Sequence, residues 1–180
     1  MIKKTYKNTN KMPLAVTHVL LTIIMVDLYR DYITKHKGYF TLHTVFIAGF
    51  AGLLPDIDIP LNWILNIFGA SLLHRTITHT PLFALIFLIP AFVFWYYKKH
   101  KIAVYFFVTT FGVFLHILLD FLFTGDGSGI MFLYPLSTTM FELNLLSSLA
   151  NSQIAAGVDA IILLLWLWHE EIKHKISDFI

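Results

Sequence analysis

The sequence predicts an all-α integral membrane protein, a helical bundle with about five membrane-embedded helices and one short interfacial helix. Of its 180 residues, 57% are hydrophobic and 13% are charged, and the mean hydropathy is +0.71. A soluble domain carries about 25% charged residues, so this chain has too few to cover a surface that faces water. We expect a single membrane-embedded domain over residues 1–180, in which residues 1–12 form a basic polar tail.

Five apolar runs predict the membrane-embedded helices, and they lie at residues 13–29, 39–54, 81–97, 102–123 and 153–168. The first run is interpreted as a retained helix, because no small-residue cleavage site follows it. Thr80 and Pro81 predict the N-cap and the first residue of the third helix. Residues 102–123 form the clearest span, since a helix needs roughly 20 apolar residues to cross a bilayer.

The remaining segments are shorter or more polar. The second run stops at Pro55, and its small residues Ala48 and Gly52 would let another helix backbone approach closely. Residues 62–73 are amphipathic and predict a helix that lies along the membrane interface. Residues 124–152 are rich in Gly, Ser and Thr and predict a loop before the last helix.

Seven ionisable residues, all Asp or His, lie inside or beside the apolar runs: His18, Asp56, Asp58, His74, His79, His116 and Asp120. Such groups cost roughly 2.5–3.5 kcal/mol each on membrane-insertion scales, and they usually face the bundle interior, pair with one another or bind an ion. If the five helices alternate in direction, all seven lie toward the same membrane face as the N-terminus. His116 and Asp120 also share one helix face, because they are four residues apart.

This set of side chains has the composition of a metal site. The chain has no cysteine, so a metal must be bound by nitrogen and oxygen atoms. Imidazole and carboxylate ligands favour a divalent ion, with zinc the first expectation and manganese the second. Seven candidate ligands exceed the needs of one tetrahedral ion, which favours two ions, or one ion with supporting residues.

Each motif taken alone also has a simpler interpretation. An Asp-x-Asp pair after a proline is typical of a turn or a helix cap. A His-x-x-x-Asp pair on a helix is compatible with a buried hydrogen-bonded pair, and a lone histidine such as His18 with a packed core residue. Asp159 is compatible with a supporting partner of a ligand histidine or with a hydrogen bond between two helices. The convergence of all the motifs on one face is what favours the metal site.

The motifs occur in a recognisable order: Thr17-His18, GLLPDID at residues 52–58, HRTITHTP at residues 74–81 and HILLD at residues 116–120. In this order they resemble the YdjM-type family, which is described as LexA-regulated, membrane-bound, metal-dependent hydrolases. The resemblance extends from Thr17 to Pro135 and implies a metal-dependent hydrolase in a membrane. Ile59 departs from the family pattern, in which a polar residue often follows PDID, so this position supplies no ligand. The order is also loosely similar to that of zinc-dependent phospholipase C, which suggests a phosphoester substrate.

A hydrolase of this kind would use a metal ion to acidify a bound water and to stabilise charge on a phosphoester. We assign catalytic roles to Asp58 and Arg75. The guanidinium of Arg75 can bind a phosphate oxygen, and the alternative role for this residue is that of an anchor at the membrane interface. Thr78 and Thr124 are candidates for orienting the substrate. Because the site is close to one membrane face, the expected substrate is a membrane lipid or another amphiphilic molecule. The net charge of +2 gives no reason to expect nucleic acid.

Two other functions fit the same residues. Acids and histidines inside a membrane also mark the pathways of transporters and ion-conducting proteins, although the one-sided clustering and the lack of an internal repeat argue against this. A non-catalytic module with a structural metal would have a closed coordination sphere. The loops on the opposite face carry more Lys and Arg, so the positive-inside rule favours a site on the extracytoplasmic face of the cell membrane, although the basic N-terminal tail favours the opposite orientation.

Overall fold

The computed structural model describes residues 15–35, 38–71, 74–123, 129–143, 145 and 152–175. This part of the chain is helical, with no β-structure in it beyond an isolated bridge between Ile130 and Phe141. Its α-helices are α1 (Ala15–Leu28), α2 (Leu42–Ala51), α3 (Asp58–Ile67), α4 (Pro81–Tyr96), α5 (His100–Phe123) and α6 (Ser152–His174). Three short helical segments are η1 (Tyr29–Thr34), η2 (Pro55–Ile57) and η3 (Ile77–His79). The all-α prediction is confirmed; the basic tail lies outside the described residues.

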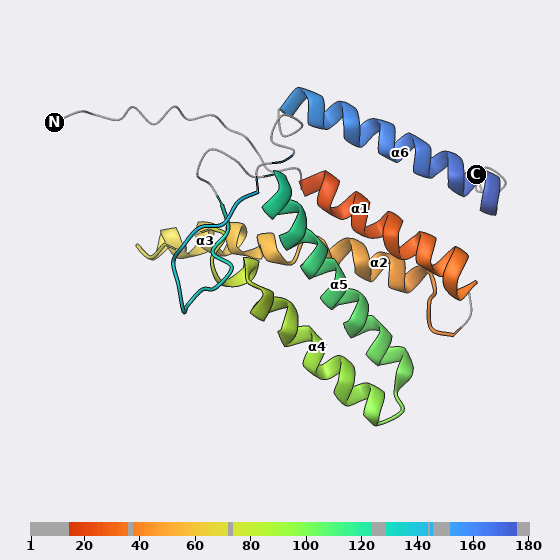
Figure 1. Cartoon of the computed structure of the whole chain (residues 1–180), viewed down its shortest axis with the longest axis horizontal. Coiled ribbons are helices and arrows are strands. Elements are labelled where there is room, and N and C mark those ends of the chain that lie inside the picture. The colour runs from red at the N-terminus through yellow and green to blue at the C-terminus, as the bar shows by residue number, and fades with distance from the viewer. Residues whose placement is uncertain are drawn as a thin grey trace.

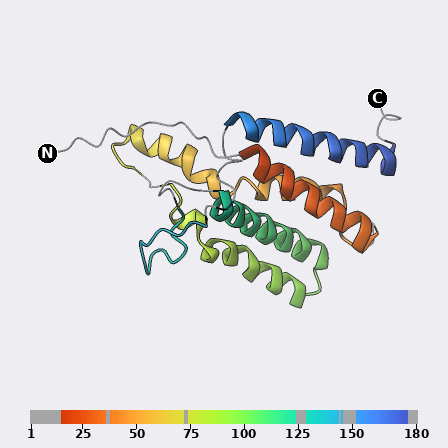
Figure 2. The same ribbon diagram turned by 45° about the horizontal axis from the view of Figure 1, so that its top comes forward.

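The bundle is built around α5, which packs against α4, α2 and α1. Figures 1 and 2 show α6 alongside α1 on the outside of the bundle, while α3 projects away from the other helices. Buried valines such as Val26, Val45 and Val108 fill the junction of α1, α2 and α5. A second core, which includes Val113 and Ile117, lies between α4 and α5. The two cores lie on different sides of α5.

Small residues bring three helix backbones together beside the polar residues. A Cβ atom on Gly112 would lie 2.5 Å from the Cβ atom of Ala51, so α5 crosses α2 at this glycine. A Cβ atom on Gly52 would lie 3.0 Å from the carbonyl oxygen of His18 in α1. The predicted close approach at the small residues of the second run is therefore confirmed.

The predicted start of α4 is also confirmed. The Thr80 hydroxyl accepts a hydrogen bond of 3.3 Å from the backbone N–H of Phe83, and Pro81 is the first helical residue. An N-cap side chain of this kind satisfies one of the free N–H groups of the first turn. Because the cap fixes the first turn of α4, it also helps to position the preceding residues 74–79, which contact the C-terminal end of α5.

Three boundaries differ from the prediction. The predicted interfacial helix at residues 62–73 is instead α3, which begins at Asp58 and ends at Ile67. It ends there because Gly69 adopts a left-handed conformation with φ of 73°, and the Ala70 N–H bonds to the Leu65 carbonyl, as in a Schellman motif. The first helix continues as a π-helical segment to Thr34, and α6 extends to His174, beyond the apolar run.

By length and composition, α5 can cross a membrane, and α2 together with Pro55–Ile67 can form a second span that is bent by 50°. The helix α4 is apolar but has only 16 residues. The described helices therefore include one or two clear membrane spans, and the prediction of five is not confirmed.

Candidate metal centre

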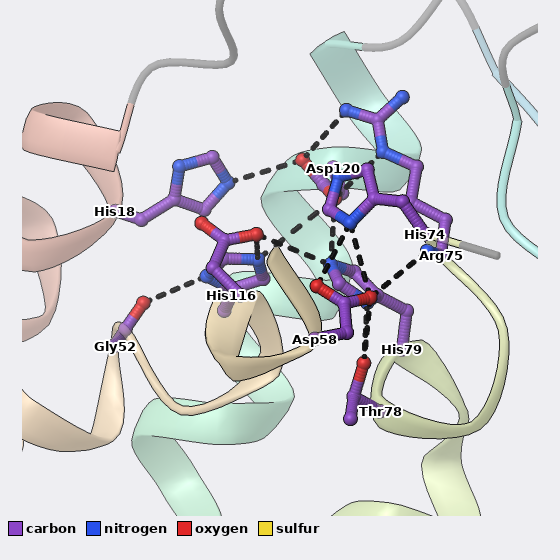
Figure 3. A network of polar contacts seen from close by, with 10 residues as sticks. His18, Gly52, Asp58, His74, Arg75, Thr78, His79, His116 and Asp120 are labelled. Atoms are coloured by element: carbon purple, nitrogen blue, oxygen red, sulfur yellow. Dashed lines mark hydrogen bonds and ion pairs between the residues drawn. The ribbon is translucent and has the colours of Figure 1, made fainter. Parts of the chain in front are cut away.

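The structure brings all seven predicted residues together near the C-terminal end of α5 (Figure 3). The imidazole ring centroid of His116 lies 4.2 Å from that of His18 and 5.2 Å from that of His79, and His79 lies 5.0 Å from His74. The helices α1 and α5, the η2 turn and the loop before α4 each contribute at least one side chain. Segments far apart in the sequence thus form one compact polar cluster, which we call the His/Asp cluster.

The distances between neighbouring ligand atoms of five of these side chains fit metal coordination. The Nε2 atom of His79 lies 3.4 Å from Asp120 Oδ2 and 3.5 Å from Asp56 Oδ1. The Nε2 atom of His116 lies 3.6 Å from Asp56 Oδ1 and 3.8 Å from Asp120 Oδ2, and His18 Nε2 lies 3.4 Å from Asp120 Oδ1. Bonds of 2.0–2.2 Å to a tetrahedral zinc ion place neighbouring ligand atoms about 3.3–3.6 Å apart. The observed separations are close to this value and longer than good hydrogen bonds.

Hydrogen bonds on the far side of two rings determine which nitrogen faces the cluster. His116 Nδ1 lies 2.7 Å from the Gly52 carbonyl oxygen, which can only accept, so Nδ1 carries the proton. Thr78 donates its hydroxyl proton to Asp58 Oδ2 at 3.1 Å and lies 3.0 Å from His79 Nδ1. Since that proton is already given to Asp58, His79 Nδ1–H donates to the Thr78 oxygen. Both Nε2 atoms then present lone pairs to the cluster, as in metal-binding histidines.

Both of these Nε2 atoms are also buried, so water does not solvate them. The side chains of His79 and His116 are at most 1% exposed, and within the described part of the chain their Nε2 atoms have no hydrogen-bond partner. Buried polar atoms almost always have a partner, so two such nitrogens in one cluster need an explanation. A cation bound between them and the neighbouring carboxylates would provide it. The donor set, nitrogen and oxygen only, suits zinc or manganese.

Two groups of three residues place their ligand atoms within 4.8 Å of one another, and each group could hold an ion. One group is buried and consists of His18, His116 and Asp120. The other consists of Asp56, His74 and His79, and here the side chain of His74 is 35% exposed. The cluster is therefore closed on the side of α1 and α5 and open at His74.

Asp58 lies at the edge of the cluster, where it holds the loop before α4. Its carboxylate accepts hydrogen bonds from His74 Nδ1 at 2.9 Å and 3.0 Å, from the Arg75 backbone N–H at 3.2 Å and from the Thr78 hydroxyl. These contacts orient His74 and, through Thr78, His79. The metal-binding and catalytic roles predicted for Asp58 stay predictions, and its visible contacts are those of a residue that positions ligands.

Arg75 lies beside the cluster and pairs with Asp120. Its Nε atom lies 3.3 Å from Asp120 Oδ2, and Nη2 lies 3.5 Å from Asp120 Oδ1. The Arg75 backbone is left-handed, with φ of 64°, and its carbonyl oxygen accepts a hydrogen bond from the Met131 N–H. A guanidinium is thus held at the cluster, as a phosphate-binding role would require. Thr124, the other predicted substrate contact, lies outside the described residues.

A second polar cluster, at the other end of α1, was not predicted. Arg30 bonds to Asp27 at 2.8 Å and to Asp31 at 3.1 Å, and His174 of α6 lies 2.8 Å from Asp31. The sequence signal was the spacing of these first three residues at i, i+3 and i+4, which places them on one helix face. Asp159 accepts a hydrogen bond of 2.6 Å from Thr17, so it links two helices, as one of its two interpretations predicted.

Comparison with known proteins then places the chain in a family. The model of the YdjM inner membrane protein family matches residues 12–176. The chain belongs to this family. The match agrees with the resemblance of the sequence motifs and includes every residue of the His/Asp cluster. As a YdjM inner membrane protein, the chain is a membrane protein, in agreement with its apolar helix α5. No curated protein and no solved structure matches it.

Proposed function

We propose that this YdjM family member is a membrane-bound metal-dependent hydrolase that cleaves a phosphoester of a lipid or another amphiphilic substrate. The observation that carries the proposal is the set of 3.4–3.8 Å separations between histidine Nε2 atoms and carboxylate oxygens in a buried cluster. A hydrogen-bonded structural core would instead pair these atoms at about 2.7–3.2 Å.

The residues that would hold the metal are His18, His116 and Asp120 on the closed side and Asp56 with His79 beside them. Zinc is the expected ion and manganese the second choice, because both accept imidazole and carboxylate ligands. When bound, such an ion acidifies a water molecule and stabilises negative charge on a phosphoryl oxygen.

The chain itself supplies orientation and proton handling at the open side. Asp58 accepts a hydrogen bond from His74 Nδ1–H, so the Nε2 lone pair of His74 is available at the exposed edge, either to an ion or to a proton of the attacking water. Arg75 is in place to hold a phosphate oxygen in exchange for part of its contact with Asp120. The open edge also argues against a purely structural metal, which would be enclosed on all sides.

One observation supports the ion-conducting alternative. Buried polar residues occur toward both ends of α1, where His18 belongs to the His/Asp cluster and Asp27 to the second polar cluster. His18 and Asp27 lie on the same helix, nine residues or about 13.5 Å apart. Between them, the buried Thr22 donates a hydrogen bond from its hydroxyl to the carbonyl oxygen of His18 in its own helix. Ion flux across the membrane of liposomes that contain the purified protein would favour this alternative. Hydrolysis of a phosphoester without any ion flux would favour the hydrolase.

The decisive experiment is an assay of the detergent-purified protein on a lipid phosphoester and on a simple phosphodiester. Activity should be abolished by a chelator and restored by zinc or manganese. Asp58→Asn should remove activity while the protein remains helical, and Arg75→Ala should weaken activity with metal still bound. Asp31→Asn, in the second polar cluster, is the matched control and should stay active. A metal-replete protein that is inactive on every phosphoester tested would refute the hydrolase.

We further propose that the His/Asp cluster lies toward the extracytoplasmic face of the membrane. This orientation rests on the positive-inside rule. The chain has no cysteine, so single cysteines can be introduced without background. A membrane-impermeant maleimide applied to intact spheroplasts should label Ser71→Cys, three residues before His74 in the sequence, and not Lys101→Cys, at the start of α5. The opposite labelling pattern would place the site on the cytoplasmic face.

A further inference from the structure

The second polar cluster extends along α6 and joins the C-terminal ends of α1 and α6, which lie side by side in both views (Figures 1 and 2). Four of its side chains place one oxygen or nitrogen atom each within 4.8 Å of one another: Asp27, Asp31, His169 and Glu170. The three acids among them are at most 8% exposed. The contact between the two helices thus encloses three carboxyl groups in one buried site.

These carboxyl groups cannot all be ionised without further positive charge. Together they would carry −3, against the +1 of the buried Arg30 guanidinium. The imidazoles of His169 and His174 also face the carboxyl groups and can each hold one proton. The ammonium group of Lys173 lies at the edge, over the ring of Tyr32 at 4.6 Å from its centroid. Because unbalanced buried charge is costly, protons bound within the cluster have to balance the remainder.

The contacts of Asp27 and Glu170 indicate where one such proton lies. Asp27 accepts hydrogen bonds from Arg30 Nη2 at 2.8 Å and from the Trp166 indole N–H at 3.2 Å, as a carboxylate does. Asp27 also shares a hydrogen bond with the carboxyl group of Glu170. Two carboxyl groups can form this bond only if one of them is protonated. Burial and the bond to Asp27 raise the pKa of Glu170 above its ordinary value, so Glu170 is the group that holds the proton.

The distances in this cluster are those of hydrogen bonds and not of metal coordination. Nitrogen donors lie 2.8–3.2 Å from the carboxylate oxygens of the second polar cluster. The corresponding separations in the His/Asp cluster are 3.4–3.8 Å. A proton therefore accounts for the second polar cluster better than a metal ion does.

A chain of polar contacts connects this buried pair to the surface. Glu170 Oε1 lies 3.2 Å from Nδ1 of His169, and Nε2 of the same ring lies 3.0 Å from the Tyr32 hydroxyl. Tyr32 is 54% exposed. The proton on Glu170 can therefore exchange with the surroundings through an imidazole, which has one nitrogen toward each side.

We propose that Asp27 and Glu170 form a proton-binding site, and that the proton they share holds the C-terminal part of α6 against α1. When the proton leaves, two adjacent carboxylates repel each other across the interface between the helices. Within the described residues, α6 packs mainly against α1, so this repulsion loosens α6 from the bundle. The site lies at the opposite end of α1 from the His/Asp cluster, so its action is independent of the proposed hydrolase.

Infrared spectroscopy of the purified protein tests for the shared proton. A protonated carboxyl group has a C=O stretch that carboxylates lack. This band should be present in the wild type at neutral pH, absent from Glu170→Gln, and lost at a lower pH in Asp27→Asn than in the wild type. Glu171→Gln, which removes a carboxyl group from the next position of α6, is the matched control and should keep the band. A wild type without the band, or an Asp27→Asn variant that loses it at the wild-type pH, would overturn the inference.

Amide hydrogen exchange tests whether the proton holds α6. At about pH 9, where even buried Glu carboxyl groups ionise, peptides from α6 should exchange faster in the wild type than in Glu170→Gln. The reason is that glutamine keeps a hydrogen bond to Asp27 and carries no charge. At about pH 5, close to the ordinary Glu range, the two proteins should exchange alike. Glu171→Gln should match the wild type at both pH values.

Thermal unfolding supplies the sign of the effect. Because the folded protein binds the proton more tightly than the unfolded chain, the stability that the proton contributes is present in acid and is lost as the pH rises above 4.5 and through the raised pKa. The Tm of the wild type should fall by about 3–5 °C for each pH unit over which only the folded protein keeps the proton. Glu170→Gln should lack this fall.

Two outcomes of these measurements would overturn the inference. Equal exchange of α6 in the wild type and Glu170→Gln at about pH 9 would mean that the proton does not hold the helix. A zinc content that falls in Glu170→Gln would mean that these acids bind a metal ion instead. Neither measurement uses a substrate, so a protein that hydrolyses no phosphoester would refute the proposed function and leave this inference standing.

Discussion

Replacement of Thr78 by valine should weaken metal binding although Thr78 is not itself a ligand. The Thr78 hydroxyl donates to Asp58 Oδ2 at 3.1 Å and accepts from His79 Nδ1 at 3.0 Å, so it connects the carboxylate to the imidazole. Valine has almost the same shape and removes both hydrogen bonds. His79 would lose the contact that fixes its tautomer and ring orientation, and its Nε2 atom would no longer be held toward the cluster.

The expected magnitude follows from the position of Thr78 behind a single ligand. Loss of such a supporting contact typically lowers metal affinity by about 10–100-fold, which corresponds to about 1.4–2.7 kcal/mol at 25 °C. The assay is competition between the purified protein and a zinc chelator of known affinity, with the wild type measured beside the variant. Zinc content after dialysis against the same chelator gives a second readout.

A matched control separates this effect from a general loss of structure. Thr110 in α5 also has a hydroxyl bonded at 2.9 Å, in this case to the backbone carbonyl of Phe106 in its own helix. Thr110→Val should bind zinc with wild-type affinity. Unchanged affinity in Thr78→Val would refute the argument that the chain from Asp58 through Thr78 orients His79, and an equal loss in both variants would mean that the effect is not specific.

Three further outcomes are expected. His116→Ala should lower the zinc content of the purified protein, measured by elemental analysis, whereas His43→Ala, outside the cluster, should not; equal content in both would make His116 a structural residue. Gly112→Ala should lower stability by about 1–3 kcal/mol, because its new Cβ would lie 2.5 Å from that of Ala51, whereas Gly157→Ala, where nothing lies within 4 Å, should not; thermal unfolding in detergent measures both. Burial alone would raise the pKa of Asp31, but hydrogen bonds from His174 and Arg30 outweigh this effect and lower the pKa. The stability that the ionised carboxylate contributes is therefore present above about pH 4 and is lost as the pH falls further. Asp31→Asn should remove this loss, so that the melting temperature of the variant depends less on pH in the acid range.

Local signals in the sequence were sufficient where a helix boundary depends on neighbouring residues alone. The Thr80–Pro81 pair gave the start of α4, because an N-cap hydroxyl and a proline act within one turn. The start of α3 at Asp58 was missed, since Pro55 was interpreted as a stop. A proline is tolerated in the first turn of a helix, and the chain resumes a helical path after a bend of 50°.

The extent of α6 could not be predicted from hydropathy. The apolar run ends near Trp168, but the helix continues because Glu170 and His174 face polar partners on α1 and η1. Those partners lie more than 130 residues away in the sequence. A polar helical turn whose contacts are all distant looks the same in the sequence as a solvated end.

The composition of the His/Asp cluster could be predicted, but the direction of each side chain could not. Asp56 and Asp58 are two residues apart in a helical turn, and side chains at this spacing point about 200° apart around the axis. Only one of them can face the histidine Nε2 atoms, and the structure places Asp56 there, while Asp58 faces the loop before α4. A repeated Asp in PDID carries no signal for which one does so.

The charge of the cluster limits how many ions it holds before substrate binds. The three carboxylates of Asp56, Asp58 and Asp120 carry −3, and the guanidinium of Arg75 carries +1, so the sum is −2 when the imidazoles are in the neutral form that binds metals. One divalent ion neutralises this charge, whereas two would leave +2 in a largely buried site, which is costly unless an anion compensates. We therefore expect about one zinc per chain in the purified protein and a second only in the presence of a phosphate ester. Elemental analysis with and without a non-hydrolysable phosphonate lipid measures this. Two tightly held ions without any added anion would contradict the charge balance and would require an imidazole or water to be deprotonated in the resting site.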